Sequence, residues 1–148
     1  MGTIWVDADG CPRGVLHAVE ELAEAYGWQY RYVATYAHEL NHSHRIPIDQ
    51  GDQSTDLYIV NHVRAGDIVV TQDIGLAAIC QARLGIGIHV SGHVYEASEM
   101  EWVLELRAQS AKARRAGYRT KGPKKRTASD DQQFYRALER VLQEANHS

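Results

Sequence analysis

IWVDADGCP, residues 4–12, takes the chain from a short apolar strand through two aspartates and into the first turn of a helix. Pro12 suits that turn, because the opening N–H groups of a helix have no intrahelical partner. Asp7 and Asp9 are two residues apart, so an extended chain places both side chains on the same side. Two anions placed in this way repel each other unless a cation or a proton lies between them.

Strand and helix signals alternate outward from this stretch over the first 90 residues. Apolar residues at helical spacing predict a helix that follows Pro12, runs to Tyr26 and ends at Gly27. Residues 67–71, DIVVT, are almost free of polar interruption, which is typical of a parallel strand covered on both faces. The other expected strands are 3–7, 29–35 and 86–90, and the other expected helices run from Ser54 or Thr55 to about Ala65 and over 74–85. This alternation predicts a parallel α/β sheet.

The rest of the chain is expected to be mainly helical, with candidate helices at 96–116 and 130–145. Ser129 with Gln132 resembles a capping box at the start of the second of these helices. Residues 36–53 are polar and predict a long loop, a kind of segment that is often functional. A chain of 148 residues fits a single domain that is large enough to bury a core.

The net charge of −3 hides an uneven distribution along the chain. Residues 1–106, the acidic body, hold 5 Lys or Arg against 15 Asp or Glu, whereas residues 107–126, the basic arm, hold 9 Lys or Arg and no acid. Basic arms often meet nucleic acid. A solvated face, or an arm docked on the protein's own acidic body, would explain the same run. The candidate nucleic-acid-binding residues are Arg114, Arg115, Arg119, Lys121, Lys124, Lys125 and Arg126.

The compartment is indicated by cysteine content and apolar runs. Cys11 and Cys80 are far apart and form no disulfide framework, as expected of a reduced cytosolic protein. No basic stretch with a long apolar region precedes the first strand. No apolar run approaches the roughly 20 residues of a membrane span. We therefore expect a cytoplasmic protein with no membrane partner.

Asp73 repeats the arrangement seen at the end of the first strand, because it follows the 67–71 strand and precedes a helix. Asp7, Asp9 and Asp73 should therefore converge at the carboxyl edge of the sheet, where open α/β sheets bind ligands. Asp56 opens the intervening helix and is a fourth candidate. Several carboxylates with waters are the ligands of a hard cation such as Mg²⁺ or Mn²⁺. Helix capping is the alternative for each aspartate and the favoured interpretation for Asp56 taken alone, but it leaves the Asp7–Asp9 pair unexplained.

Four blocks of sequence stand in order along nearly the whole chain: WVDADGCP (5–12), TDLYIVNHV (55–63), GDIVVTQDIGLAA (66–78) and TKGP…DDQQFYRALERVL (120–142). They resemble the YaiI/YqxD family of uncharacterised bacterial proteins, which is grouped with the PIN-like nuclease folds. The resemblance implies a PIN-like three-layer α/β/α sandwich with a central, mainly parallel sheet and C-terminal helices. It also implies a carboxylate-bound divalent metal and suggests phosphodiester hydrolysis on RNA. The PIN-like acidic set maps to Asp7, Asp56 and Asp73, with Asp9 a motif residue beside them.

Two positions depart from the family pattern. Gly10 stands where alanine is common, and Gln53 stands where an acidic residue often precedes the Asp56 position by three. Gly10 also makes the first block resemble the DxDG motif of haloacid-dehalogenase-type phosphatases, with Asp7 as the nucleophile and Asp9 as the general acid or base. Those enzymes need a lysine that holds the phosphoryl group, and the acidic body contains none.

Thiol and histidine chemistry rank below the carboxylates. Cys11 is expected at a helix N-terminus, which lowers a thiol pKa, but Asp7 and Asp9 raise it again, so we interpret Cys11 as a packed thiol. The histidines of the long loop are interpreted as solvated; they are His38, His42 and His44.

The leading hypothesis is a PIN-like endoribonuclease or related phosphodiesterase that depends on Mg²⁺ or Mn²⁺ and acts on RNA. The metal-binding and catalytic residues would be Asp7, Asp9, Asp56 and Asp73. The alternatives are a non-catalytic nucleic-acid-binding protein and a haloacid-dehalogenase-like phosphatase. A turnover assay with and without a chelator separates the first two.

Overall fold

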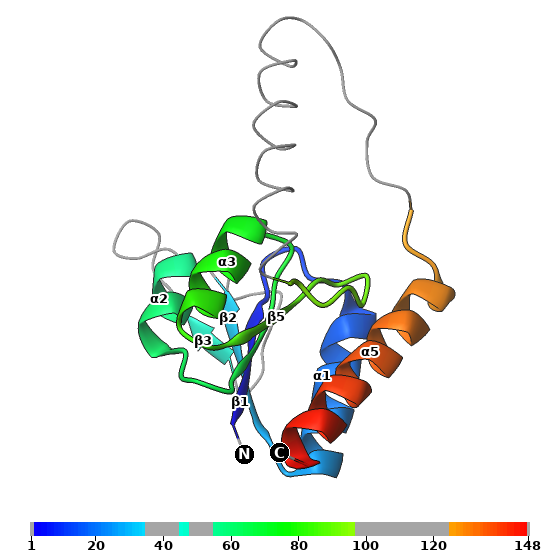
Figure 1. Cartoon of the computed structure of the whole chain (residues 1–148). Helices are drawn as coiled ribbons and strands as arrows, with labels where there is room; N and C mark the ends of the chain where they lie inside the picture. The colour runs from blue at the N-terminus through cyan, green and yellow to red at the C-terminus, as the bar shows by residue number, and fades with distance from the viewer. Residues whose placement is uncertain (1, 35–44, 48–54, 97–124, 148) are drawn as a thin grey trace, which may run out of the picture.

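The structure is a computed structural model that describes residues 2–34, 45–47, 55–96 and 125–147. Its centre is a sheet in the order β3-β2-β1-β4-β5, in which every neighbouring pair of strands is parallel. The strands are β1 (Thr3–Asp7), β2 (Gln29–Ala34), β3 (Arg45–Pro47), β4 (Ile68–Val70) and β5 (Ile86–Ile88). The α/β class and the parallel sheet expected from the sequence are therefore confirmed (Figure 1).

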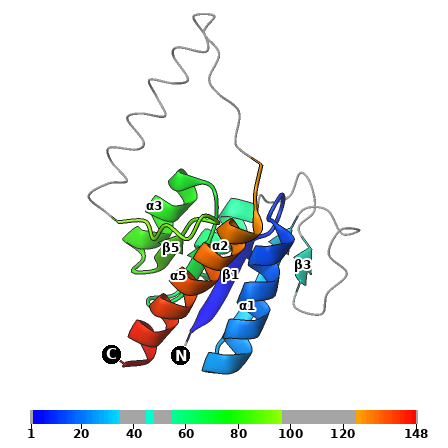
Figure 2. The ribbon, with the colours of Figure 1, turned by 90° about the vertical axis from the view of Figure 1, so that its right-hand side faces the viewer.

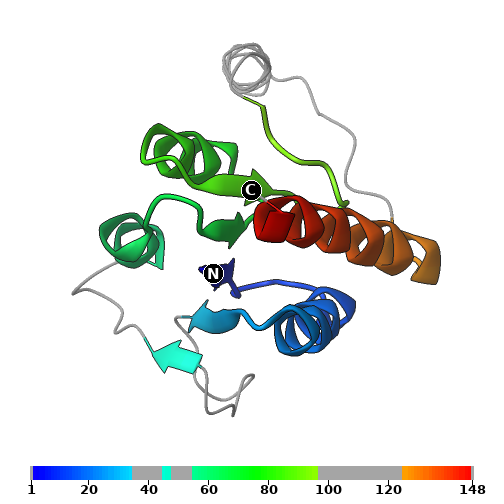
Figure 3. The same ribbon diagram turned by 60° about the horizontal axis from the view of Figure 1, so that its bottom comes forward.

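Helices cover both faces of the sheet, because successive side chains of a strand point to opposite faces. Ile4 and Val6 of β1 belong to a core shared with α1 (Arg13–Tyr26) and α5 (Ala128–His147). Trp5, between them, packs on the other face with α2 (Thr55–His62) and α3 (Ile74–Ala82). Figure 2 shows α1 and α5 side by side, and Figure 3 shows helices on either side of the strands. The described chain thus forms three layers, with α5 as its C-terminal helix.

The strand order reverses between β1 and β4. From β1 the chain moves outward to β2 and β3, and after α2 it returns to the other side of β1 and continues to β5. In open α/β sheets this reversal leaves a crevice outside the carboxyl ends of the two strands, where ligands bind. Asp7 is the last residue of β1, and Thr71 directly follows β4. Asp7, in the middle of the stretch 4–12, therefore lies at the switch point of the sheet.

The prediction that residues 36–53 contain only loop is wrong. β3 lies within this range and pairs in parallel with β2 at the edge of the sheet. Pro47 ends β3, and an edge strand tolerates proline because one side of its backbone needs no partner strand. A three-residue strand has too little alternation to be recognised from sequence, so only its pairing with β2 identifies it.

The helix expected over 74–85 ends earlier, at Ala82. The left-handed residue that follows it is Leu84, with φ 68°. Gly85 has a packing role, because a Cβ at this position would lie 3.1 Å from the Cys80 carbonyl oxygen. The Gly85 N–H donates to that same oxygen at 2.9 Å, which satisfies a carbonyl group at the helix end.

α5 begins at Ala128, earlier than expected, because its capping box is not the predicted one. The Thr127 N–H donates to Asp130 Oδ2 at 2.8 Å, and the Asp130 N–H donates to the Thr127 hydroxyl at 3.4 Å. Ser129 lies inside the helix. The predicted apolar face is confirmed: its buried or partly buried residues are Phe134, Ala137, Leu138, Val141, Leu142 and Ala145.

Several expectations fall outside the described residues. These are most of the helix expected over 96–116, the histidines of the long loop and most of the basic arm. Over the ranges that the structure does describe, no helix has the length and apolar character needed to cross a membrane.

Candidate carboxylate site

Thr71 joins two of the candidate aspartates at the switch point. Its hydroxyl group donates a hydrogen bond to Asp7 Oδ2 at 3.0 Å and accepts one from the Asp73 N–H at 3.0 Å. The Thr55 hydroxyl group donates to Asp7 Oδ1 at 3.5 Å. The end of β1, the end of β4 and the start of α2 therefore meet around the Asp7 carboxyl group.

Asp73 caps α3, and Asp56 lies beside it. Asp73 Oδ1 accepts hydrogen bonds from the N–H groups of Gly75 at 2.9 Å and Leu76 at 3.4 Å, so Asp73 has the capping role that the sequence offered as the alternative to metal binding. The Asp56 carboxyl group, in the first turn of α2, lies close to that of Asp73. Burial is the main cause that raises the pKa of Asp56, and the charge of Asp73 and hydrogen bonding with its carboxyl group act in the same direction.

The Asp7 carboxyl group is affected by the other three candidates. Burial is the main cause that raises its pKa to about 6, and the charges of Asp56, Asp9 and Asp73 act in the same direction. The hydrogen bond from Thr71 lowers this pKa but does not cancel the rise. The structure thus brings the predicted aspartates close enough that each disfavours the ionisation of Asp7.

Asp9 lies in a turn at the protein surface. The Cys11 N–H donates to the Ala8 carbonyl oxygen at 3.1 Å, and Gly10, the third residue of this turn, has a φ of 73°. A positive φ at this position is typical of a type II turn and favours glycine. Gly10 is therefore explained by backbone conformation without a phosphatase motif. Asp9 is exposed and acts on Asp7 through its charge.

The donor set suits a hard cation. The groups that meet around Asp7 are carboxyl and hydroxyl oxygens, and no lysine or arginine charge is among the influences on its pKa. Over the described ranges, no three His, Cys, Asp or Glu side chains are already arranged to hold one ion together. Mg²⁺ usually keeps several waters and takes one or two carboxylates directly. Asp7 and Asp73 are the two carboxylates that could take part in that mode of binding.

Two residues of this site, Thr71 and Thr55, had no role in the sequence-based hypothesis. Thr71 is the first residue after β4 and stands two residues before the cap of α3. That spacing lets one hydroxyl group serve both Asp7 and the backbone of Asp73. The pattern Thr-x-Asp after an apolar strand is the signal that points to Thr71, whereas only the tertiary packing of α2 identifies Thr55.

Cys11 is a packed, protonated thiol. It is partly buried against the core and forms no disulfide. Burial and the charge of Asp7 raise its pKa to about 12, although the charge of Arg126 lowers it. A thiol with this pKa has almost no thiolate at neutral pH, so it is a poor nucleophile.

The basic arm is only partly described. Five of its candidates lie outside the described residues: Arg114, Arg115, Arg119, Lys121 and Lys124. Lys125 is exposed. The Arg126 side chain is only 23% exposed, and its Nε atom donates to Asp131 Oδ1 at 2.6 Å. For Arg126, docking on the protein's own acidic groups is therefore what the structure shows.

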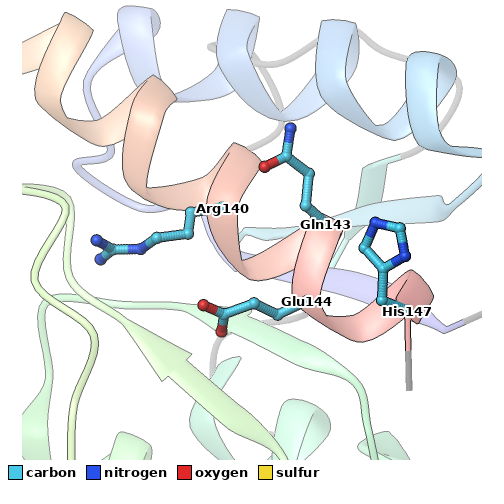
Figure 4. Close-up of a pocket in the computed structure, with 4 residues that line it drawn as sticks. All are labelled: Arg140, Gln143, Glu144 and His147. Carbon is cyan, nitrogen blue, oxygen red and sulfur yellow. The ribbon is translucent and has the colours of Figure 1, made fainter.

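Cavities lined by described residues lie away from the carboxylates. One, of about 450 Å³, runs along the last turns of α5 and is lined by Arg140, Gln143, Glu144 and His147 (Figure 4). Another, of about 270 Å³, is lined in part by Asp67, at the edge of the sheet opposite the switch point. The buried Asp67 carboxylate accepts hydrogen bonds from the Thr3 N–H and the Trp5 indole, each at 3.0 Å, which explains it as a structural residue.

Comparison with known proteins gives one consistent result. Residues 5–144 match the family model described as "Uncharacterized BCR, YaiI/YqxD family". The chain is similar to a UPF0178 protein of Exiguobacterium sibiricum, 43% identical over 143 residues that cover 95% of this chain and 96% of the relative. It is also similar to UPF0178 proteins of Shouchella clausii, 42% identical with 95% and 92% covered, and of Heliobacterium modesticaldum, 40% identical with 95% and 97% covered. No solved structure matches the chain.

Proposed function

The chain belongs to the YaiI/YqxD family, and we propose that it is a PIN-like phosphodiesterase that depends on a divalent metal and acts on RNA. The observation that carries the proposal is the placement of Asp7, Asp56 and Asp73 around the switch point of a parallel sheet. Such a crevice is where open α/β sheets bind ligands. Carboxylates that raise one another's pKa are a common feature of functional sites.

Asp7 and Asp73 would hold the ion, with Asp56 and Asp9 close enough to bind its waters. Mg²⁺ or Mn²⁺ supplies an activated water and stabilises negative charge on a phosphate. Thr71 contributes by fixing the Asp7 carboxyl group and the Asp73 backbone relative to each other. Its hydrogen bond also favours the ionised form of Asp7, which is the form that binds a cation.

RNA is the proposed substrate because an acidic site repels a polyanion, and a basic arm close to it lowers that barrier. Residues 107–126 supply nine cationic side chains to a chain whose first 106 residues are acidic. Phosphate contacts of this kind give affinity without sequence preference.

The experiment measures cleavage of a mixed set of RNA oligonucleotides with Mn²⁺, with Mg²⁺ and with EDTA. We expect cleavage only with metal, and its loss in Asp7→Asn and Asp73→Asn together with weaker Mn²⁺ binding in calorimetry. Glu24→Gln is the matched control, because Glu24 is an exposed carboxylate on α1. It should retain both cleavage and Mn²⁺ binding.

Each alternative function has its own result in the same experiment. RNA binding without turnover under any metal condition would replace the proposal with a non-catalytic nucleic-acid-binding protein. Hydrolysis of a phosphomonoester such as p-nitrophenyl phosphate, with RNA left intact, would favour the phosphatase. A wild-type protein that binds no divalent ion at millimolar concentration would refute the metal site itself.

A further inference from the structure

Arg126 lies two residues before α5, whose first turn lies beside the first turn of α1 (Figure 2). α1 begins just after the turn that follows β1, so the starts of both helices flank the switch point.

Asp131 fixes the direction of the Arg126 side chain. Its Oδ1 atom accepts the Arg126 Nε–H at 2.6 Å. The Asp131 carboxyl group lies directly on α1 at Gly14, where any Cβ would overlap it. α1 has no side-chain cap of its own, since Pro12 stands at its N-cap, and a carboxylate near a helix N-terminus is favourable. The Gly14–Asp131 contact therefore holds the guanidinium group in one place.

The far end of this guanidinium group is left without a partner. The NH2 nitrogen of Arg126 is buried, and nothing in the described part of the chain accepts a hydrogen bond from it. A buried donor on a charged group that lacks an acceptor is costly, and such groups are rare in native proteins. A ligand oxygen would remove that cost.

We propose that Arg126 binds a backbone phosphate oxygen of the nucleic acid through its buried NH2 group, with Asp131 and Gly14 as its positioning residues. This inference rests on the proposed function, which supplies the nucleic acid whose phosphate Arg126 would bind. Arg126 is thereby separated from the rest of the basic arm. Lys125, its exposed neighbour, would contact phosphate through solvent, whereas Arg126 would do so from a fixed, partly desolvated position.

The test measures the affinity of a single-stranded RNA oligonucleotide in Ca²⁺, a hard cation that fills oxygen sites. Arg126→Gln should weaken binding by roughly tenfold to a hundredfold, and Arg126→Lys by less, because charge remains but the planar fork is lost. Arg136→Gln is the matched control, since Arg136 is exposed on α5, and its affinity should stay within about twofold. The loss in Arg126→Gln should persist at high salt, because screening acts weakly on a desolvated contact.

A double-mutant cycle tests the positioning role. Asp131→Asn should weaken RNA binding in the wild-type background and have little further effect in Arg126→Gln. A merely structural role predicts additive losses of affinity and melting temperature in both backgrounds. Additive effects would overturn the positioning role of Asp131.

Inorganic phosphate separates this inference from the proposed function. Millimolar phosphate should raise the melting temperature of the wild type, and raise it much less in Arg126→Gln. If RNA is not bound but this phosphate effect is seen, the function on RNA fails and the anion site stands. If RNA is bound or cleaved with equal affinity by wild type and Arg126→Gln, and phosphate shifts both alike, the inference about Arg126 is wrong while the proposed function stands.

Discussion

Asp7 combines burial, like charge and hydrogen bonding in one side chain. Its folded pKa of about 6 lies above the ordinary 3.8, so the folded protein binds a proton more readily than the unfolded chain between these values. Stability without metal should therefore be highest below about pH 4 for this group, and should fall as pH rises toward 6 and beyond. The full difference corresponds to roughly 3 kcal/mol.

Asp7→Asn tests this linkage in metal-free protein. The variant lacks the titrating carboxyl group, so it should unfold at higher denaturant concentration than wild type at pH 7.5, and show a much smaller advantage at pH 4.5. Chemical unfolding in EDTA at both pH values measures the difference, with Glu24→Gln as the control. An equal difference at the two pH values would contradict the raised pKa. Added Mn²⁺ should stabilise wild type and leave Asp7→Asn unchanged.

Cys11 tests whether proximity to the site implies a chemical role. Cys11→Ala should keep any hydrolytic activity within about tenfold of wild type, which is about 1.4 kcal/mol in barrier. The reason is that its raised pKa leaves the thiol protonated at neutral pH. Rates with saturating Mn²⁺ decide the matter. A loss of several orders of magnitude with Mn²⁺ binding intact would place the thiol in the mechanism.

At the scale of elements, the start of α5 connects helix capping to the site. The capping box formed by Thr127 and Asp130 lies at the start of α5, one residue after Arg126. The cap therefore also fixes the position of the Arg126 backbone. α5 then packs along α1, and its buried residues complete one side of the core. Because two reciprocal hydrogen bonds fix where α5 begins, they also restrict where the neighbouring Arg126 side chain can lie.

Thr127→Ala should destabilise the protein by roughly 1 kcal/mol, as is typical for loss of an N-cap side chain. Ser129→Ala is the matched control, because the sequence alone would favour Ser129 as the cap, whereas the structure places it inside the helix. Its effect should stay within about 0.5 kcal/mol. Urea unfolding of the two variants measures both values. A larger loss in Ser129→Ala would show that the helix begins at the predicted position.

At the scale of the whole molecule, charge is divided between an acidic body and a basic arm. The carboxylate site lies within the body, so a polyanion approaches it against a repulsive field unless cations are close. Most of the arm lies outside the described residues, but its last member, Arg126, is attached to α5 and α1 through Asp131. The arm therefore ends beside the first turns of α5 and α1.

Replacing Lys124 and Lys125 together with alanine should flatten the salt dependence of RNA binding. Each single-strand phosphate contact contributes about 0.7 to the slope of log affinity against log salt, so the double variant should lose about 1.4. All RNA sequences should be affected alike. A salt titration of oligonucleotide binding, with melting curves beside it, measures the change. An unchanged slope with a lower melting temperature at low salt would mean that these lysines only dock on the acidic body.

Much of this architecture is predictable because it depends on local periodicity. The apolar run before Asp7 predicts β1 with its observed bounds, and helical spacing predicts α1 and the buried face of α5. The sequence is less reliable where two neighbouring residues could each begin the same helix. Ser129 and Thr127 both begin a plausible capping box, and the chain uses Thr127. β3 is too short to leave a periodic pattern, so the sequence alone missed it.

The sequence by itself determined the parallel α/β class and the presence of four candidate aspartates at strand ends and helix starts, because these follow from periods of two and 3.6 residues and from end-of-element chemistry. Only the tertiary structure decided how those groups meet. The Thr71 bridge between Asp7 and Asp73, and the close approach of Asp56 to Asp73, join segments far apart in the chain. The burial of the Arg126 NH2 group likewise depends on α5 packing against α1. Such contacts form between different helices and strands. The sequence pattern of a single element therefore does not predict the distances between their side chains.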